Sequence, residues 1–304
     1  MAGIGFRLKR LLAEETYSGW LRAHLYGAVV SSGPWLLSVC TLAVLAFLSG
    51  SLVESREQAL FRAIVVYTYT FSLVTTGAIQ MVVTRHLSDC LYVGRVGAVL
   101  STFRWSLGAT ALAHLALAAG FYGWAPDLDV RVRLLGIVLF VAVANTWVVM
   151  IFVGALQDYA SVGLAFLVGN VLSFGGALGL GARGGLVGSL GGFVLGQVAT
   201  FFMLASRVER EFAGTVPPAR PGLLRAVGRY RDLALAGFLY NVAISVDRLV
   251  FWLSPVHTGF GSWFYGSLYD TPLFLAYLSV VPSLAVFLVS VETDFYDQIG
   301  RAHV

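Results

Sequence analysis

The sequence predicts an all-α polytopic membrane protein with about eight transmembrane helices in 304 residues. Of these residues 58% are hydrophobic and only 12% are charged, and the mean hydropathy is +0.81. In soluble domains about a quarter of all residues are charged. The apolar residues are also gathered in long uninterrupted runs, which is typical of helices that cross a bilayer. These observations exclude the soluble globular class.

Eight apolar segments are long enough to cross the hydrocarbon layer, which takes about 20 helical residues. Between the fifth and sixth segments the chain reads "GGALGLGARGGLVGSLGG". Small residues let membrane helices approach closely, so we expect these two helices to pack tightly. No strand and no GK[ST] sequence accompanies the glycines, so they do not indicate a phosphate-binding loop. The eight segments are residues 25–48, 60–83, 102–122, 134–156, 159–180, 186–205, 233–254 and 272–291.

Basic residues are distributed unequally between the two sides of these spans. Because Lys and Arg accumulate in cytoplasmic segments, the asymmetry predicts a cytoplasmic N-terminus. The positive charge lies beside the spans, where topology is set, so it does not indicate nucleic acid. The outer segments would hold Arg56, Arg62, Arg131, Arg133 and Arg183. The inner segments would hold Arg7, Lys9, Arg10, Arg22, Arg85, Arg95, Arg104, Arg207, Arg210, Arg220, Arg225, Arg229 and Arg231.

A basic, proline-containing connection divides the chain into two units. A faint repeat joins the units, since "LYGAVVSSGPW" at 25–35 aligns with "LYNVAISVDRL" at 239–249. Six spans return the chain to the same side, so the two units would be parallel repeats, as in some transporters. The expected divisions are a cytoplasmic or interfacial segment 1–24, a six-helix lobe 25–205, a linker 206–232, the first two helices of a second lobe 233–298, and a tail 299–304.

The tail "IGRAHV" at 299–304 is expected not to be native. A common sequencing-adapter stretch, ATC GGA AGA GCA CAC GTC, encodes these six residues. The chain would then be a fragment of a longer protein, with the later helices of the second lobe missing.

Two adjacent charges, Asp247 and Arg248, interrupt the apolar stretch "FLYNVAISVDRLVFWL". On the membrane-insertion scale two central charges cost about 5–7 kcal/mol. Arg248 shares a helix face with Ser245 and Asn241, at i−3 and i−7. Intramembrane charges mark ion or substrate paths by default. The alternative is a structural ion pair that locks two helices together.

Other polar residues inside the spans are candidates for lining a cavity. Arg104 falls within the third predicted span, and Asn145 and Asn170 fall within two others. Amides such as these, and those of Gln80 and Gln197, also hold helices together. Aromatic side chains could stack on sugar rings or form interfacial belts. These aromatic residues are Tyr67, Tyr69, Trp105, Trp147 and Trp252.

The first span contains "SSGPW", in which Ser31, Ser32, Gly33 and Pro34 predict a helix kink. Proline removes a backbone donor and clashes with the preceding turn. A kink is useful to a carrier that rocks between two openings. Proline is also simply commoner in membrane helices than in soluble ones, so both interpretations remain open.

No catalytic motif stands out, and we expect neither an enzyme nor a cofactor. Asp127 and Asp129 resemble a DxD motif, but the predicted topology places them outside, away from nucleotide-sugars. The histidines lack metal-ligand spacing, and Cys40 and Cys90 fit neither a disulfide framework nor a zinc site. No nucleophile elbow or Walker loop is present.

Three stretches together point to a family. "MAGIGFRLKRLL", "SSGPWLLS" and "FLYNVAISVDRLVFW" resemble the PelG family, the membrane proteins of the Pel exopolysaccharide system in biofilms. The resemblance implies a MATE- and lipid-flippase-like fold of two six-helix lobes around a central cavity. It also implies export of an N-acetylhexosamine polysaccharide across the bacterial inner membrane. The implied partners are a cytoplasmic PelF-like glycosyltransferase and PelD- and PelE-like membrane proteins.

Two other functions remain open. The chain could be a cation-coupled small-molecule antiporter of the same fold, or a non-transporting membrane scaffold for the polysaccharide synthase. A neighbouring glycosyltransferase gene and a cyclic-di-GMP receptor gene would favour polymer export.

Overall fold

A computed structural model describes most of the chain between residues 56 and 254 and shorter pieces on either side. Most of the predicted span 25–48 lies outside the described residues, as do the predicted kink Ser31, Ser32, Gly33 and Pro34 and the tail 299–304, and the predicted span 272–291 is described only in pieces. The described residues are 16–26, 37–38, 40–41, 45, 56–124, 127–156, 158–214, 222–254, 258–260, 263–265, 269, 273, 276, 279–280, 282–284, 286–287 and 289–291.

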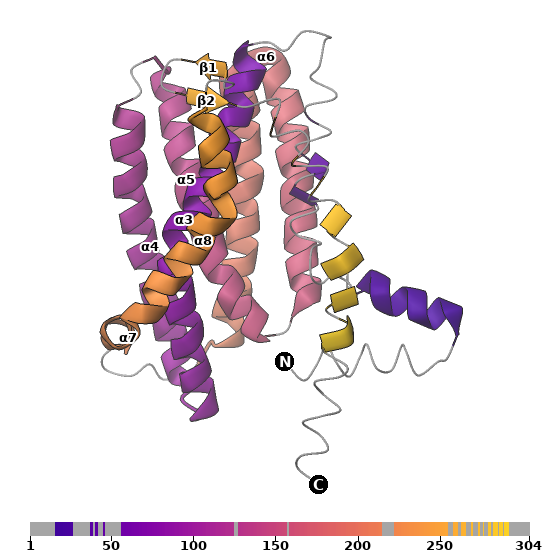
Figure 1. The fold of residues 1–304 in the computed structure, drawn as a ribbon, viewed down its shortest axis with the longest axis vertical. Helices are drawn as coiled ribbons and strands as arrows, with labels where there is room; N and C mark the ends of the chain where they lie inside the picture. The colour runs from indigo at the N-terminus through magenta and orange to yellow at the C-terminus, as the bar shows by residue number, and fades with distance from the viewer. Residues whose placement is uncertain are drawn as a thin grey trace.

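Among the described residues the regular structure is helical apart from one short hairpin, which follows the last long helix (Figure 1). Strands β1 (Thr258–Phe260) and β2 (Trp263–Tyr265) pair antiparallel and were not expected from the sequence. Residues 17–26 are also helical. The other helices are α3 (Arg56–Tyr92), α4 (Gly97–Gly123), α5 (Val130–Leu156), α6 (Tyr159–Glu211), α7 (Leu223–Arg229) and α8 (Arg231–Trp252).

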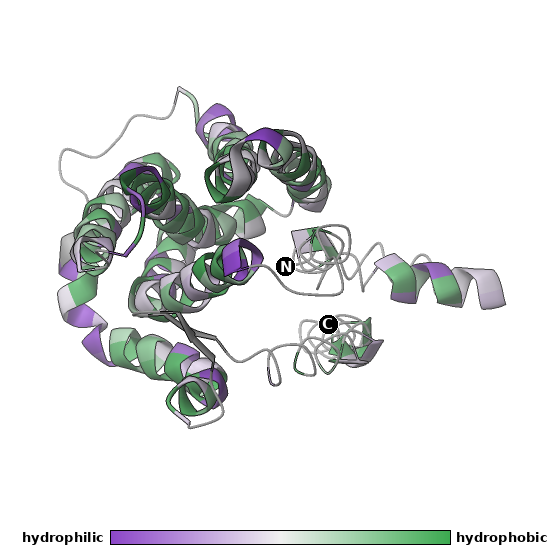
Figure 2. Ribbon diagram, turned by 90° about the horizontal axis from the view of Figure 1, so that it is seen from above, coloured by the Kyte–Doolittle hydropathy of each residue, from purple (hydrophilic) through white to green (hydrophobic). Residues whose placement is uncertain are grey.

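Among the described residues, five helices are long and apolar enough to cross a membrane: α3, α4, α5, α6 and α8. They contain or closely overlap the predicted spans from 60–83 through 233–254, so the chain is a multi-pass membrane protein. Helices dominate because every backbone polar group must be satisfied internally in lipid. In Figure 2, where the bundle is seen from above, hydrophobic residues are prominent in these helices.

Helix α6 corresponds to two predicted spans, 159–180 and 186–205, joined by a sharp turn. A straight helix of its 53 residues would be about 80 Å long, far beyond the hydrocarbon core of about 30 Å. Gly185 breaks the helix with φ 55° and ψ −136°, a conformation that glycine adopts without a steric penalty. The Leu186 N–H beyond the turn donates to Glu57 Oε2 at 3.1 Å, so α3 caps the second half.

The two halves of α6 lie against each other through glycine, which confirms the predicted close packing. A methyl group added at Gly176 would lie 2.9 Å from the Cα of Gly192. Farther down the pair, the Ser173 hydroxyl donates to the Phe193 carbonyl at 3.0 Å. Only residues without a Cβ allow backbones this close, because any side chain would occupy the contact.

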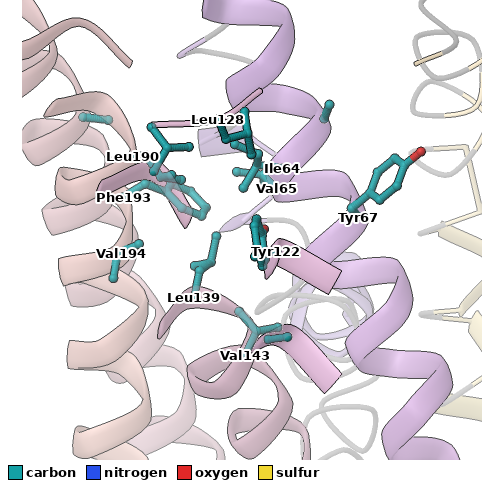
Figure 3. Close-up of a cluster of buried hydrophobic side chains, with 14 of the residues drawn as sticks. Ile64, Val65, Tyr67, Tyr122, Leu128, Leu139, Val143, Leu190, Phe193 and Val194 are labelled. Atoms are coloured by element: carbon teal, nitrogen blue, oxygen red, sulfur yellow. The ribbon is translucent and has the colours of Figure 1, made fainter. Parts of the chain in front are cut away.

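Helix α3 is the central element and packs against α4, α5, α6, α7 and α8. Half of the residues in the most apolar 18-residue stretch of α3 are buried, compared with 17% of the residues in that of α8, which lies on the outside of α3 (Figure 1). One apolar cluster surrounds Ile64 and Val65 of α3, with Leu139 from α5 and Leu190 from α6 (Figure 3). A second cluster surrounds Val83 near the other end of α3.

The helix at residues 17–26 lies beside this bundle and runs across it rather than along it (Figures 1 and 2). Its Tyr17 and Trp20 are exposed. This orientation is typical of a helix that lies at the membrane surface.

Candidate functional site

Polar residues follow α3 through the apolar part of the chain at intervals of four. The Thr76 hydroxyl donates to the Ser72 carbonyl at 2.7 Å, and the side-chain amide N–H of Gln80 (Nε2) donates to the Thr76 hydroxyl at 2.9 Å. Residues four apart form one ridge on a helix. The sequence analysis singled out only Gln80 of this ridge, although the four-residue spacing of the polar residues is visible in the sequence. Its members are Thr68, Ser72, Thr76, Gln80, Thr84 and Ser88.

In the middle of α3, four consecutive contacts join it to the other long helices. The Tyr69 hydroxyl donates to Gln197 Oε1 of α6 at 2.8 Å, and Ser38 from the first predicted span bonds to the same hydroxyl. The Trp147 indole N–H of α5 donates to the Ser72 hydroxyl at 3.1 Å.

The other two contacts join α3 to α4 and α8. His114 Nε2 of α4 lies 2.8 Å from the Thr75 hydroxyl. Arg248 Nη1 of α8 donates to the Thr70 hydroxyl at 3.0 Å. We call the eight residues of these contacts the α3 polar layer: Tyr69, Thr70, Ser72, Thr75, His114, Trp147, Gln197 and Arg248.

The α3 polar layer is thin and lies between the two apolar clusters. From Tyr69 to Thr75 the helix rises about 9 Å. Ile64 and Val65 belong to the cluster on one side, and Val83 to the cluster on the other. Interhelical hydrogen bonds in such surroundings hold helices in register. For Gln197, which also donates to the Ser173 hydroxyl at 3.1 Å, the predicted role of joining helices is confirmed.

The charged pair of α8 has partners on two sides. Besides the contact with Thr70, the Arg248 backbone N–H donates to Asp247 Oδ1 at 2.8 Å. The Tyr269 hydroxyl donates to Asp247 Oδ2 at 2.7 Å. Both charged side chains are half-buried. They lie about 22 Å along α8 from Asp232 and about one turn before its last residue, Trp252.

The polar stripe predicted on α8 is buried. Asn241 and Ser245 are 6% and 3% exposed, whereas Val246 and Val250, on the face opposite Arg248, are 46% and 61% exposed. Asn241 faces α3, because a methyl group added at Gly77 would collide with its amide nitrogen. The structure therefore brings one face of α8 against α3 and leaves the opposite face for lipid.

Three other candidates lie elsewhere in the fold. Arg104 is 61% exposed and makes a bidentate ion pair with Glu209 near the end of α6, at 2.9 and 2.6 Å. Asn145 and Asn170 are buried, and their amide N–H groups bond to carbonyls of their own helices. Their Oδ1 atoms have no hydrogen-bond partner among the described residues.

The end of the bundle that holds Arg104 carries further ionic contacts. Asp158 caps α6 through the Ser161 N–H, and Arg207 from the last turns of α6 bonds to it at 2.7 Å. The Ser161 and Arg207 hydrogen bonds hold the pKa of the Asp158 carboxyl below its usual value. Tyr230 likewise lowers the pKa of Asp89 by donating to it at 2.7 Å. These contacts tie the two ends of α6 together and α3 to the start of α8.

The α3 polar layer combines neutral donors and acceptors with one guanidinium group, and these groups bond to one another across helices. It presents hydroxyl, amide, indole and guanidinium groups, which together donate and accept hydrogen bonds. Trp252, one helical turn after Arg248 on α8, also stacks on Tyr67 of α3, with ring centroids 4.5 Å apart. Among the described residues, no three His, Cys, Asp or Glu side chains gather to hold a metal ion.

Comparison with known proteins gives one match. No curated protein and no solved structure matches the chain. Residues 1–301 match the family described as "PelG: Putative exopolysaccharide Exporter (EPS-E)". Because this match covers nearly the whole sequence, the chain belongs to the PelG family of exopolysaccharide exporters.

Proposed function

We propose that this chain forms part of the path by which a Pel-type N-acetylhexosamine polysaccharide crosses the bacterial inner membrane, without covalent change to the polymer. Membership of an exporter family supports the cargo class. The observation that carries the mechanism is the charged pair Asp247–Arg248, whose arginine belongs to the α3 polar layer.

The pair is tolerated because it has local partners. Two central charges cost about 5–7 kcal/mol on the insertion scale. Hydrogen bonds to charged groups return about 1.5–3 kcal/mol each, so Thr70 and Tyr269 offset much of this cost. Both charges nevertheless remain partly exposed. A partly exposed charge at this depth faces either lipid or a polar path, and the cost of lipid exposure favours the path.

The layer suits a sugar polymer. N-acetylhexosamine units carry hydroxyl and amide groups along the chain, and the α3 polar layer offers complementary donors and acceptors from five helices. A transported polymer must also leave each site again, which favours many neutral contacts over a few strong ones. We propose that the pair supplies the one charged contact in this path.

The test is polysaccharide export by the full-length protein with its partners present. Asp247→Asn and Arg248→Gln should each abolish export while the amount of inserted protein stays unchanged. Val250→Ala, on the opposite face of α8, is the matched control and should export normally. If both charge variants export normally, the pair is not part of the path.

A purely structural role for the pair makes a different prediction. Tyr269→Phe removes a partner of Asp247 but leaves the charge in place. If the pair only locks α8 in place, Tyr269→Phe and Asp247→Asn should lose stability and export in parallel. A role in the path predicts export by Tyr269→Phe and none by Asp247→Asn.

We further propose the MATE- and flippase-like arrangement of two six-helix lobes, with the N-terminus in the cytoplasm. PelF-like, PelD-like and PelE-like proteins would be the partners on the cytoplasmic side and in the membrane. Inverted vesicles that contain only the full-length protein and the synthase test this proposal. Polymer inside the vesicles supports a conduit, whereas polymer found only outside supports the scaffold alternative.

A further inference from the structure

One member of the α3 polar layer, His114, is a buried titratable side chain. His114 is 4% exposed and lies about 25 Å along α4 from its first residue, Gly97. Of the other histidines that the structure describes, His24 lies in the surface helix and His86 near the end of α3. An ionisable group inside a membrane bundle is a candidate for proton binding.

The hydrogen bonds of His114 fix one proton and leave the other variable. Nδ1 lies 2.8 Å from the Thr110 carbonyl, which can only accept, so Nδ1 carries hydrogen. Nε2 lies 2.8 Å from the Thr75 hydroxyl, which can either donate or accept. That hydroxyl has a second acceptor, the Phe71 carbonyl, 2.6 Å away. Its single hydrogen can serve only one of them at a time.

Both protonation states therefore have a complete set of hydrogen bonds. In the neutral ring, Nε2 accepts the Thr75 hydrogen. When a proton from water adds to the Nε2 lone pair, the new N–H donates to the Thr75 oxygen, and the Thr75 hydrogen turns to the Phe71 carbonyl. Protonation of His114 therefore reverses its hydrogen bond with Thr75 and reorients the Thr75 hydroxyl on α3, within the α3 polar layer.

Few charged or titratable groups surround His114. No Asp, Glu, Lys or Arg lies between Arg62 and Arg85 on α3, after Arg104 on α4, or after Arg133 on α5. From α5 the Phe140 ring packs on the imidazole, with centroids 5.5 Å apart. The charged or titratable residues on the adjoining helices are Arg56, Glu57, Arg62, Tyr67, Tyr69, Arg85, His86, Asp89, Cys90 and Tyr92 of α3, Arg104 and Tyr122 of α4, Arg131 and Arg133 of α5, and Arg225 and Arg229 of α7.

A buried polar atom one turn away has no hydrogen-bond partner. The Thr110 hydroxyl is buried and unpaired among the described residues. Such a group normally binds water, which would bring a proton donor next to the imidazole.

We propose that His114, with Thr75 and Thr110, is a proton-binding site inside the membrane, and that its proton is the ion coupled to transport. The coupling rests on the proposed export function, whereas proton binding does not. An imidazolium without an acidic partner is costly where water is excluded. The site would therefore take up a proton when the bundle opens to water and release it when the bundle closes.

Proton binding is measured directly by ¹⁵N NMR of histidine-labelled full-length protein in lipid nanodiscs. A variant that keeps His114 and replaces the other histidines by glutamine gives an unambiguous signal. We expect the His114 ring to change from neutral to charged as the pH is lowered. Thr75→Val should weaken proton binding about tenfold, a shift of about one pH unit in the midpoint. A ring that stays neutral throughout, or a midpoint unmoved by Thr75→Val, would overturn the site.

Coupling is measured by the dependence of export on the transmembrane pH gradient. His114→Gln should export at a rate that no longer responds to the gradient, while Thr146→Val, which removes a part-buried hydroxyl from the neighbouring α5, should keep the response. A full response in His114→Gln refutes coupling. Because the NMR titration needs no export, failure of the proton site and failure of the export function are distinguishable.

Discussion

The contact between the halves of α6 gives the most quantitative prediction. A methyl group at Gly176 would lie 2.9 Å from the Cα and carbonyl oxygen of Gly192. Carbon atoms in contact prefer about 3.5–4.0 Å, so Gly176→Ala requires the two halves to separate by about 0.6–1.1 Å. Overpacking of this kind costs about 1–3 kcal/mol. Each 1.4 kcal/mol is about a tenfold loss in the ratio of folded to unfolded protein.

The assay is equilibrium unfolding of the full-length protein in bilayers, followed by steric trapping or denaturant titration. Gly175→Ala is the matched control, since a methyl group there has nothing within 4 Å. Surface changes of that kind stay within about 0.5 kcal/mol. If Gly176→Ala is as stable as Gly175→Ala, the halves of α6 do not meet at Gly176, and the reasoning from glycine contacts is refuted.

Three further predictions concern the ends of the helices. Glu57→Ala removes the carboxylate that caps the second half of α6 and should cost about 0.5–2 kcal/mol of unfolding free energy; Glu57→Asn as unstable as Glu57→Ala would count against this. Because the pKa of Asp158 is lowered in the folded state, this carboxylate stabilises the protein at pH values above its unfolded-state pKa. The difference in unfolding free energy between wild type and Asp158→Ala should therefore shrink as the pH falls below about 4. A difference that grows instead would refute the cap. Arg104→Lys should change stability by less than about 1 kcal/mol and leave export intact, since its pair with Glu209 is exposed; loss of export with normal abundance would restore Arg104 as a path residue.

The sequence was sufficient to predict the long helices, because hydropathy and the need to satisfy the backbone in lipid dominate their formation. It also predicted the face of α8 that carries Asn241 and Ser245, because positions three and four apart share a helix face. The close approach within α6 followed from its glycines.

Side-chain partners across helices could not be predicted in the same way. Tyr69 and Gln197 are 128 residues apart, and nothing local in the sequence relates them. His114 was set aside because it lacks metal-ligand spacing, yet its partner is a hydroxyl on α3. Arg104 falls within the predicted span 102–122 and was also counted with the cytoplasmic segments, and its ion-pair partner, Glu209, lies on a distant helix.

The central claim is that the charged pair of α8 lies beside a polar path and not beside lipid. Thiol accessibility in cells tests it most directly, in a full-length protein with Cys40 and Cys90 replaced by serine. Arg248→Cys and Val250→Cys lie at nearly the same depth on opposite faces of α8. The account predicts that a membrane-impermeant thiol reagent modifies Arg248→Cys and not Val250→Cys. Equal reactivity, or modification of Val250→Cys alone, would contradict it.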